Sequence, residues 1–346
     1  MNKRMRVQVT ELVEGDVVKR SVFNEHGLHV LSAGTVLDER EIHTLLRHHI
    51  DYIDIENRQL HTQSGSDNIV QMQVHYEEAL SGVRQLLIDA ARVNKIDDNV
   101  VQEALNPLMD QLTVERDVVS LMMQLNNQDD YTCQHSVHVG MLSYFLATWL
   151  GYELDDSLRI GKAGYLHDIG KCKIDPQILN KPGKLTADEF EVIKQHTVAG
   201  HDIIMNSYDD EWLAVAALYH HERLDGRGYV HGLKGDEIPD VAKIVAIADI
   251  YSAMTSTRVY QAKQDHYKVL QELHQMSYTG LDAKMTQTFI RHMLPNFINK
   301  QVILNDGRAG VIVMTNNTEY FRPLVRVDEG FVDLADQRHM TIEQIL

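Results

Sequence analysis

Leu166-His167-Asp168-Ile169-Gly170-Lys171 is the stretch from which the rest of the chain can be interpreted. A histidine and a carboxylate stand side by side in the last turn of an apolar helix, with a lysine three residues beyond the aspartate. Burying an imidazole and an ionised carboxylate without partners costs several kcal/mol, and a cation is the simplest partner for both. A lone His-Asp pair fits a capped or solvated helix end better, so support must come from elsewhere in the sequence.

Length and charge limit the classes of protein to consider. With 346 residues the chain is too long for one ordinary core, and no Gln, Ser or Pro tract suggests disorder. The formal net charge of −17 argues against DNA or RNA as a partner, because phosphate contacts need a basic surface. A small phosphorylated ligand is compatible with this negative charge where nearby cations make the local electrostatic potential positive.

Compartment and membrane association can also be predicted. The longest apolar run, 139–150, is interrupted by Ser143 and Thr148 and is too short to span a bilayer. The basic N-terminus lacks the apolar core of a signal peptide. Two cysteines, Cys133 and Cys172, are too few for a disulfide framework. We therefore expect a cytoplasmic protein without membrane contact.

Hydrophobic patterning predicts a mainly α chain with β structure at both ends. Residues 5–57 have short strand patterns, turn signals and one helix that begins with a capping box from Asp38 to Glu41. The tail after Gln301 returns to strand patterns. The predicted segments are a small α+β accessory domain (1–57), a polar linker (58–67), connecting helices (68–126), a helical catalytic domain (127–298) and a C-terminal β segment (299–346).

Metal-ligand residues recur on the apolar stripes of successive predicted helices. His135 is spaced with Val139, Leu142, Leu146 and Trp149 so that it shares their buried face. Other donors follow at helix ends or on apolar seams: His167-Asp168 in a helix with Asp155 as N-cap, His196 after the capping box Thr186–Glu189, His220-His221, and Asp249 after Pro239. Gly200, on the seam of His196, should let another backbone come close.

Each donor alone is more readily explained as a hydrogen-bonded core residue. Taken together, the donors would each need a separate hydrogen-bond partner in the core, whereas one centre with two metal ions would bind all of them. Mixed imidazole and carboxylate donors without a cysteine pair favour two octahedral first-row ions, iron or manganese ahead of zinc or nickel.

The motifs also match a known family in order and spacing. Between about 127 and 293 the chain closely resembles the HD-GYP subgroup of the HD hydrolases, and residues 5–57 more weakly resemble a small N-terminal domain that accompanies some members. The matching motifs are His135-Ser136, 166–171, 181–186, His196 with Gly200, 220–229, 232–235 and Ala248-Asp249-Ile250-Tyr251.

The resemblance implies an all-α catalytic domain that hydrolyses cyclic dinucleotides, chiefly cyclic di-GMP, through a hydroxide bound by two metals. Two divalent ions roughly 3.5–4 Å apart would lower the pKa of a bridging water and neutralise the developing oxyanion. Asp168 would bridge both ions. The implied ligands are His135, His167, Asp168, His196, His220, His221 and Asp249.

Further roles are implied for residues around these ligands, each with a plainer alternative. Lys171 would contact a phosphate oxygen, or else stabilise a helix C-terminus. Asp129 would act catalytically as a proton relay behind the ligands, or else as a helix N-cap. Gly228 and Tyr229 would bind substrate through close backbone approach and purine stacking, or else form a helix-terminating turn. Arg258 would contact phosphate or guanine, or else lie on the surface.

Four residues depart from the family pattern. Val230 replaces a proline after Gly-Tyr, which removes a fixed φ. Ser252 replaces an aspartate and Gln261 a basic residue, and both changes suggest a shift of base preference toward cyclic GMP-AMP. Tyr131 stands where three-metal members carry glutamate, so two ions are expected.

Two other classes of function are compatible with the ligand set: a di-iron oxygenase of the HD type, and a cyclic-dinucleotide receptor without catalysis. Lys171 and the Gly-Tyr loop argue against the first, and the complete ligand set argues against the second. Protein partners bound through the N-terminal domain or the Gly-Tyr loop, and a homodimer, are left open.

Overall fold

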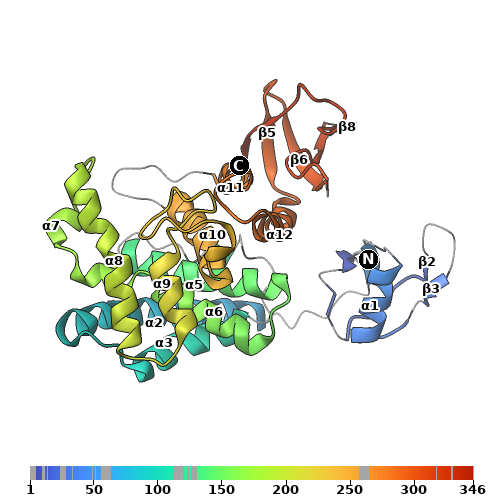
Figure 1. The fold of residues 1–346 in the computed structure, drawn as a ribbon. Coiled ribbons are helices and arrows are strands. Elements are labelled where there is room, and N and C mark those ends of the chain that lie inside the picture. The colour runs from blue at the N-terminus through green and yellow to red at the C-terminus, as the bar shows by residue number, and fades with distance from the viewer. Residues whose placement is uncertain are drawn as a thin grey trace. The chain divides into compact units, whose positions relative to one another are not determined.

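The computed structural model describes residues 5–9, 12–13, 15–23, 29–32, 34–48, 50, 52–55, 64–112, 118, 121–122, 125, 131–256, 265–316, 318–328 and 330–345. The chain divides into two compact units, Met1–Met72 and Gln73–Leu346 (Figure 1). The predicted mainly α fold class is confirmed, whereas the predicted domain boundaries stay predictions. Helix α2, Ser64–Val93, begins inside the stretch predicted as a linker.

The first unit is a small α+β module. Strands β1 (Met5–Gln8) and β4 (Tyr52–Ile55) pair antiparallel, as do β2 (Val22–Phe23) and β3 (His29–Leu31). Helix α1, Glu39–Arg47, begins at the predicted capping box, in which Asp38 accepts the backbone N–H of Glu41. Its core is aliphatic and includes Val7, Leu12, Leu45 and Ile55. This module carries none of the predicted site residues.

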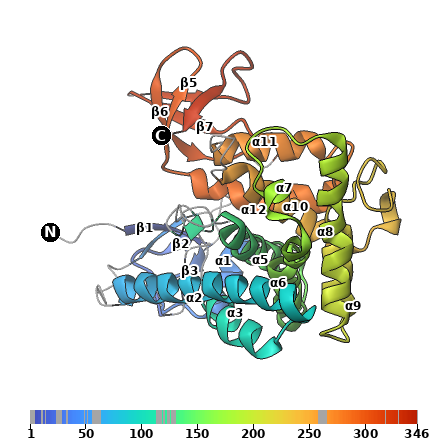
Figure 2. The same cartoon turned by 90° about the vertical axis from the view of Figure 1, so that its left-hand side faces the viewer.

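Most of the second unit is helical. Its helices and 3-10 turns are α3 (Asp98–Leu112), α5 (Tyr131–Leu150), α6 (Leu154–Leu166), η2 (Ile169–Lys173), α7 (Pro176–Leu179), α8 (Ala187–Met205), α9 (Glu211–Tyr219), η3 (Gly235–Glu237), α10 (Asp240–Thr255), α11 (His266–Met276), α12 (Ala283–Met293) and η4 (Leu294–Phe297). Helix α5 packs against α6, α10 and α12, and α8 lies beside α9 (Figure 2).

Helix α5 is the centre of this unit. Every residue from Cys133 to Ala147 is buried, so the helix is covered on all sides and not along one stripe. The predicted seam that joined His135 to Val139 and Leu142 is therefore only part of its buried surface. Trp149, predicted as a core residue, is half-buried and stacks on His292 with ring centroids 4.9 Å apart.

Helix starts were predicted with mixed success. The Thr186 hydroxyl accepts the Glu189 N–H and the Glu189 carboxylate accepts the Thr186 N–H, so the predicted capping box of α8 is confirmed. The prediction of Asp155 as the N-cap of α6 is wrong, because the cap is Glu153 and Asp155 lies in the first turn. There its charge still favours the positive end of the helix dipole.

A close backbone contact brings η2 against α8. Gly170 lies so near α8 that a Cβ on it would overlap the carbonyl oxygen of His196 and the backbone of Gly200. The prediction that Gly200 permits close approach of another backbone is confirmed. The contact sets the distance between Asp168, which precedes η2, and His196.

The C-terminal part is an antiparallel sheet in the order β8-β7-β6-β5-β9. Its strands are β5 (Gln301–Leu304), β6 (Ala309–Met314), β7 (Leu324–Val327), β8 (Gly330–Asp333) and β9 (Ile342–Ile345). The β structure predicted after Gln301 is confirmed. Among the described residues of the whole chain, no helix combines the length and apolarity that crossing a bilayer requires.

Candidate metal centre

The seven predicted metal ligands meet inside the second unit. His135 comes from α5, His167 caps the end of α6, Asp168 follows it, His196 is on α8, His220 and His221 follow α9, and Asp249 is on α10. Six of the seven are buried and His221 is half-buried. These residues make up the sets whose donor atoms lie within 4.8 Å of one another.

The two carboxylate oxygens of Asp168 face different histidines. Oδ2 lies 3.2 Å from Nε2 of His167 and 3.7 Å from Nε2 of His135. Oδ1 lies 3.3 Å from Nε2 of His196 and 3.9 Å from Nε2 of His220. Each oxygen can therefore serve a different ion, which is the arrangement of a bridging carboxylate.

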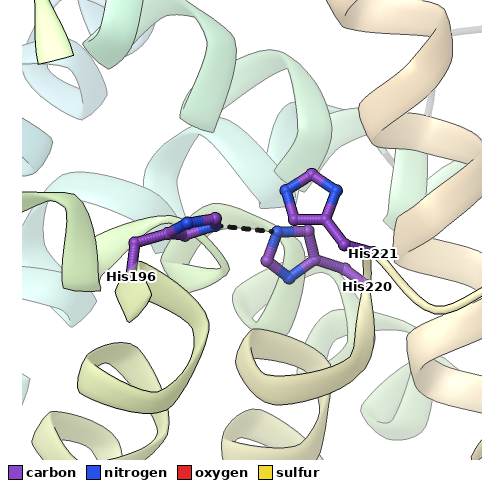
Figure 3. Close-up of side chains that lie close together, drawn as sticks. All are labelled: His196, His220 and His221. Carbon is purple, nitrogen blue, oxygen red and sulfur yellow. Dashed lines mark hydrogen bonds between the residues drawn. The ribbon is translucent and has the colours of Figure 1, made fainter. Parts of the chain in front are cut away.

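Asp249 also connects two donor groups. Its Oδ1 lies 3.0 Å from Nε2 of His135, and its Oδ2 lies 3.8 Å from Nδ1 of His221. One donor group therefore consists of His135, His167 and Asp249, and the other of His196, His220 and His221. Figure 3 shows the second group, in which the His196 and His220 rings point toward each other.

Backbone carbonyls orient three of the imidazole rings from behind. Nδ1 lies 2.7 Å from the Gly164 carbonyl in His167, 2.6 Å from the Ile193 carbonyl in His196, and 3.0 Å from the Ala217 carbonyl in His220. A carbonyl only accepts, so each Nδ1 carries a hydrogen, and in the neutral ring Nε2 presents its lone pair to the centre.

His135 is anchored differently. Its Nδ1 lies 3.0 Å from Oγ of Ser252, a side chain that is fully buried. The hydroxyl holds the ring with Nε2 toward Asp168 and Asp249. The expectation that Ser252 shifts base preference stays a prediction, and the contact that the structure gives this hydroxyl is with His135.

Unpartnered atoms in the cluster test whether a metal would fit. His167 Nε2 and Asp168 Oδ1 are buried and have no hydrogen-bond partner among the residues that the structure describes. His196 Nε2 and His220 Nε2 lie 3.4 Å apart, although both neutral rings already use their hydrogens on carbonyls. Lone pairs that face one another in a buried site are stabilised by a cation between them. The residues present therefore fit divalent ions.

Burial sets most of the protonation states of the imidazoles. It lowers the pKa of His135 and His196, and it lowers the pKa of His220 well below its usual value with help from the charge of His221. Burial brings the pKa of His221 to about 3. Burial also acts to lower the pKa of His167, but the negative charge of Asp168 outweighs it and the net shift is upward.

Both carboxylates are held ionised. Burial alone would raise the pKa of Asp168, but the neighbouring His167 and Lys171 charges bring it well below its usual value. In Asp249 the hydrogen bond from His135 and the charge of His221 have the same effect against burial. Neutral imidazoles, to which the lowered pKa values of the other four rings correspond, and charged carboxylates are the protonation states that metal binding requires.

Lys171 lies beside the bridging carboxylate. Its Nζ is 2.5 Å from Oδ2 of Asp168, and about a fifth of its side chain is exposed, at 21%. The lysine therefore reaches both the cluster and solvent. This contact is with a side chain, whereas the alternative prediction placed the lysine against a helix C-terminus.

The loop after His221 is held by a residue to which the sequence analysis assigned no role. Glu222 is buried, and its carboxylate accepts the backbone N–H groups of His231 and Gly232 on Oε1 and of Leu233 on Oε2. An acidic residue directly after two ligand histidines was the only available signal. Glu222 ties the end of the loop to the position of His221.

Gly228 and Tyr229 lie in that loop. A Cβ on Gly228 would overlap the Cα of Glu222 and the carbonyl oxygen of His221, so the close approach made by this glycine is to its own chain. The Tyr229 ring lies 4.6 Å from the His221 ring between centroids, and the peptide bond to Val230 is cis. Their predicted contacts with substrate stay predictions, and Asp129, Arg258 and Gln261 lie outside the described residues.

Comparison with known proteins identifies the helical part. Residues 119–285 match the family model described as HD domain. The chain contains an HD domain. The match includes all seven candidate ligands, the stretch 166–171 and the loop with Tyr229.

Curated relatives resemble the HD domain and its surroundings. A cyclic di-GMP phosphodiesterase of Pseudomonas aeruginosa is 34% identical over 209 residues, 60% of this chain and 50% of that protein. A cyclic di-GMP phosphodiesterase of Thermotoga maritima is 38% identical over 178 residues, 51% of this chain and 48% of that protein. The 3'3'-cGAMP-specific phosphodiesterase 1 of Vibrio cholerae is 32% identical over 191 residues, 54% of this chain and 44% of that protein. The chain thus spans about half the length of these relatives.

Proposed function

We propose that this protein is a metal-dependent phosphodiesterase that hydrolyses a cyclic dinucleotide, cyclic di-GMP or 3',3'-cyclic GMP-AMP, to the linear dinucleotide. The observation that carries the proposal is the position of Asp168, whose two oxygens face two separate histidine groups. The names of the curated relatives support the class of substrate.

Two divalent ions in this centre would supply a water of lowered pKa and neutralise charge on the phosphoryl oxygens. His135, His167 and Asp249 would hold one ion, His196, His220 and His221 the other, and Asp168 both. Iron or manganese suits these nitrogen and oxygen donors best, with nickel or zinc next.

The other residues act on the substrate and on the ligands. Lys171 steadies Asp168 through its 2.5 Å contact and offers a positive charge to a non-bridging phosphate oxygen. Ser252 and the carbonyls behind the rings keep Nε2 directed at the centre, so no reorientation is needed when substrate binds. Glu222 holds the loop that places Tyr229 against His221.

The test begins with anaerobic purification and metal analysis. Turnover is then measured on cyclic di-GMP, cyclic GMP-AMP and the linear dinucleotide. We expect about two metal ions per chain and hydrolysis of at least one cyclic dinucleotide. Asp168→Ala should abolish both, whereas Asp202→Ala, which removes a carboxylate that is 62% exposed on α8, should retain both.

Other outcomes would replace the proposal. Tight binding of cyclic dinucleotide without turnover in the metal-loaded protein would make the chain a receptor. Turnover that requires oxygen would make it an HD-type oxygenase.

A further inference from the structure

Beside the second donor group, two aromatic rings and a lysine form a cluster that is not part of either donor group. Phe190 and Lys194 lie one turn apart on α8, and Tyr229 comes from the loop after α9. The Phe190 and Tyr229 ring centroids are 5.9 Å apart, with the rings at 81°. The Lys194 Nζ lies 5.0 Å from the centroid of the Phe190 ring and 5.6 Å from that of Tyr229.

This cluster adjoins the metal ligands. The Tyr229 ring lies 4.6 Å from the His221 ring, which in turn lies 5.2 Å from the His196 ring. Phe190 is therefore separated from a ligand histidine by the width of one aromatic ring. A group bound on Phe190 would lie within one nucleotide's length of the centre.

Phe190 and Lys194 are available to a ligand. The Phe190 side chain is 43% exposed, although it is a large apolar residue. Lys194 is paired with Glu191 at 2.6 Å, and the glutamate side chain is 65% exposed. The Lys194 side chain is 22% exposed, and an ion pair with a partner so open to water contributes little free energy, so the lysine can exchange this partner for a phosphate at small cost.

The chemistry of the cluster suits a purine nucleotide. Every nucleobase has a π-face that can stack on an aromatic ring, whatever its edge. A lysine next to that ring supplies a positive charge for the adjoining phosphate. In a protein with a formal net charge of −17, such a local cation is needed to offset long-range repulsion of an anionic substrate.

We propose that Phe190 and Lys194, backed by Tyr229, form a nucleotide subsite of the phosphodiesterase: a purine of the cyclic dinucleotide stacks on Phe190, and its phosphate contacts Lys194. This subsite rests on the proposed function, because it assumes that the metal centre acts on a dinucleotide. Stacking is indifferent to the identity of the purine, so this subsite would accept guanine and adenine alike.

The experiment measures binding, so that it does not depend on turnover. The ligand is the bis-phosphorothioate analogue of cyclic di-GMP, titrated calorimetrically into the metal-loaded protein. Phe190→Ala should raise the Kd about 5- to 150-fold, the range expected for loss of one stacked base. Lys194→Gln should raise the Kd and reduce its dependence on salt, because one phosphate contact is lost.

Three further variants separate stacking from packing. Phe190→Tyr keeps the ring and should bind as the unmodified protein does, whereas Phe190→Leu keeps apolar volume and should bind as weakly as Phe190→Ala. Phe331→Ala removes another exposed phenylalanine, which lies on β8 and is 63% exposed, and should leave the Kd unchanged.

The subsite is overturned if Phe190→Ala binds within twofold of the unmodified protein, if Phe190→Leu binds as well as Phe190→Tyr, or if the unmodified protein does not bind the analogue. Failure of the proposed function has a different signature. The unmodified protein would then bind the analogue with the expected dependence on Phe190 and hydrolyse no cyclic dinucleotide.

Discussion

The Oγ atom of Ser252 on α10 lies 3.0 Å from Nδ1 of His135 on α5, and both side chains are buried. Three other ligand rings rest on backbone carbonyls, which no substitution of a side chain removes. The orientation of the His135 ring thus depends on a side chain, whereas the orientation of these three rings depends on the backbone.

Ser252→Ala should weaken metal binding at the donor group of His135, His167 and Asp249. Loss of a hydrogen bond behind a ligand histidine lowers metal affinity about 10- to 100-fold. Metal content after dialysis against a graded chelator series measures the effect. Ser143→Ala is the matched control, since Ser143 is equally buried on α5 and its hydroxyl has no hydrogen-bond partner in the described part of the chain. Equal metal loss in both variants would argue against the orienting role.

Glu222→Gln should destabilise the loop after His221. The amide keeps one acceptor for His231 and Gly232, but its NH2 group would face the Leu233 N–H, donor against donor. Loss of such a charge-assisted bond in a buried position costs about 1.5–3 kcal/mol. Urea denaturation of the metal-loaded protein gives the value. Glu237→Gln, at an exposed glutamate that accepts one N–H, should lower the free energy of unfolding by less than half as much. Similar losses for both variants would contradict the role of Glu222 in holding the loop.

Gly228→Ala should be poorly tolerated. The added Cβ would lie 2.4 Å from the Cα of Glu222 and 2.5 Å from the carbonyl oxygen of His221, and backbone atoms cannot move aside as a flexible side chain can. Overpacking of this kind costs about 1–3 kcal/mol, and it would displace His221. Thermal unfolding and metal content should both fall. Gly280→Ala, whose Cβ would meet only the Arg223 side chain at 3.6 Å or more, should behave as the unmodified protein does.

The metal-free protein should lose stability as the pH falls from about 7 to about 5. Burial lowers the pKa of His135, His196, His220 and His221 from the unfolded value of 6.5, so the unfolded chain binds more protons below that pH. Their contribution is full above 6.5 and is lost as the pH falls toward their folded pKa values. His167 opposes the trend, since its raised pKa gives stability below 6.5 that is lost at higher pH. The combined loss of stability from the four rings with lowered pKa exceeds the gain from His167.

Thermal unfolding of chelator-treated protein across this pH range checks the sign. The two aspartates of the centre do not interfere, because their lowered pKa values confine the loss of their contribution to stability to pH below about 3.8, the usual pKa of an aspartate. His221→Asn should show a smaller decrease in Tm than the unmodified protein. A Tm that stays constant or rises on acidification would contradict the assigned shifts.

Much of the centre was predictable from residue types and spacing. Adjacent His167-Asp168 at a helix end, and histidines on apolar seams elsewhere, indicated buried donors before any geometry was known. The helical period relates residues three or four positions apart, so it places a ligand on a face of its own helix. That rule placed His135, His196 and Asp249 on apolar stripes, and the full set of seven candidates came from the resemblance to HD-GYP domains.

Relations between helices were beyond such reasoning. Ser252 and His135 are 117 positions apart, and no periodicity within α5 or α10 relates them. The same limit explains why Ser252 was assigned to base preference and Phe190 was not considered. The burial of α5 on all sides also could not be recognised from its single predicted apolar stripe.

The sequence by itself determined the chemistry of this protein: imidazole and carboxylate donors, a lysine beside them, and helices on which to place them. Only the tertiary structure decided that Asp168 turns one oxygen to each histidine group, that Ser252 lies behind His135, and that Phe190 lies one ring away from His221. The reason is physical. Local periodicity sets the direction of a side chain on its own helix, whereas the distance between side chains on different helices follows from how those helices pack.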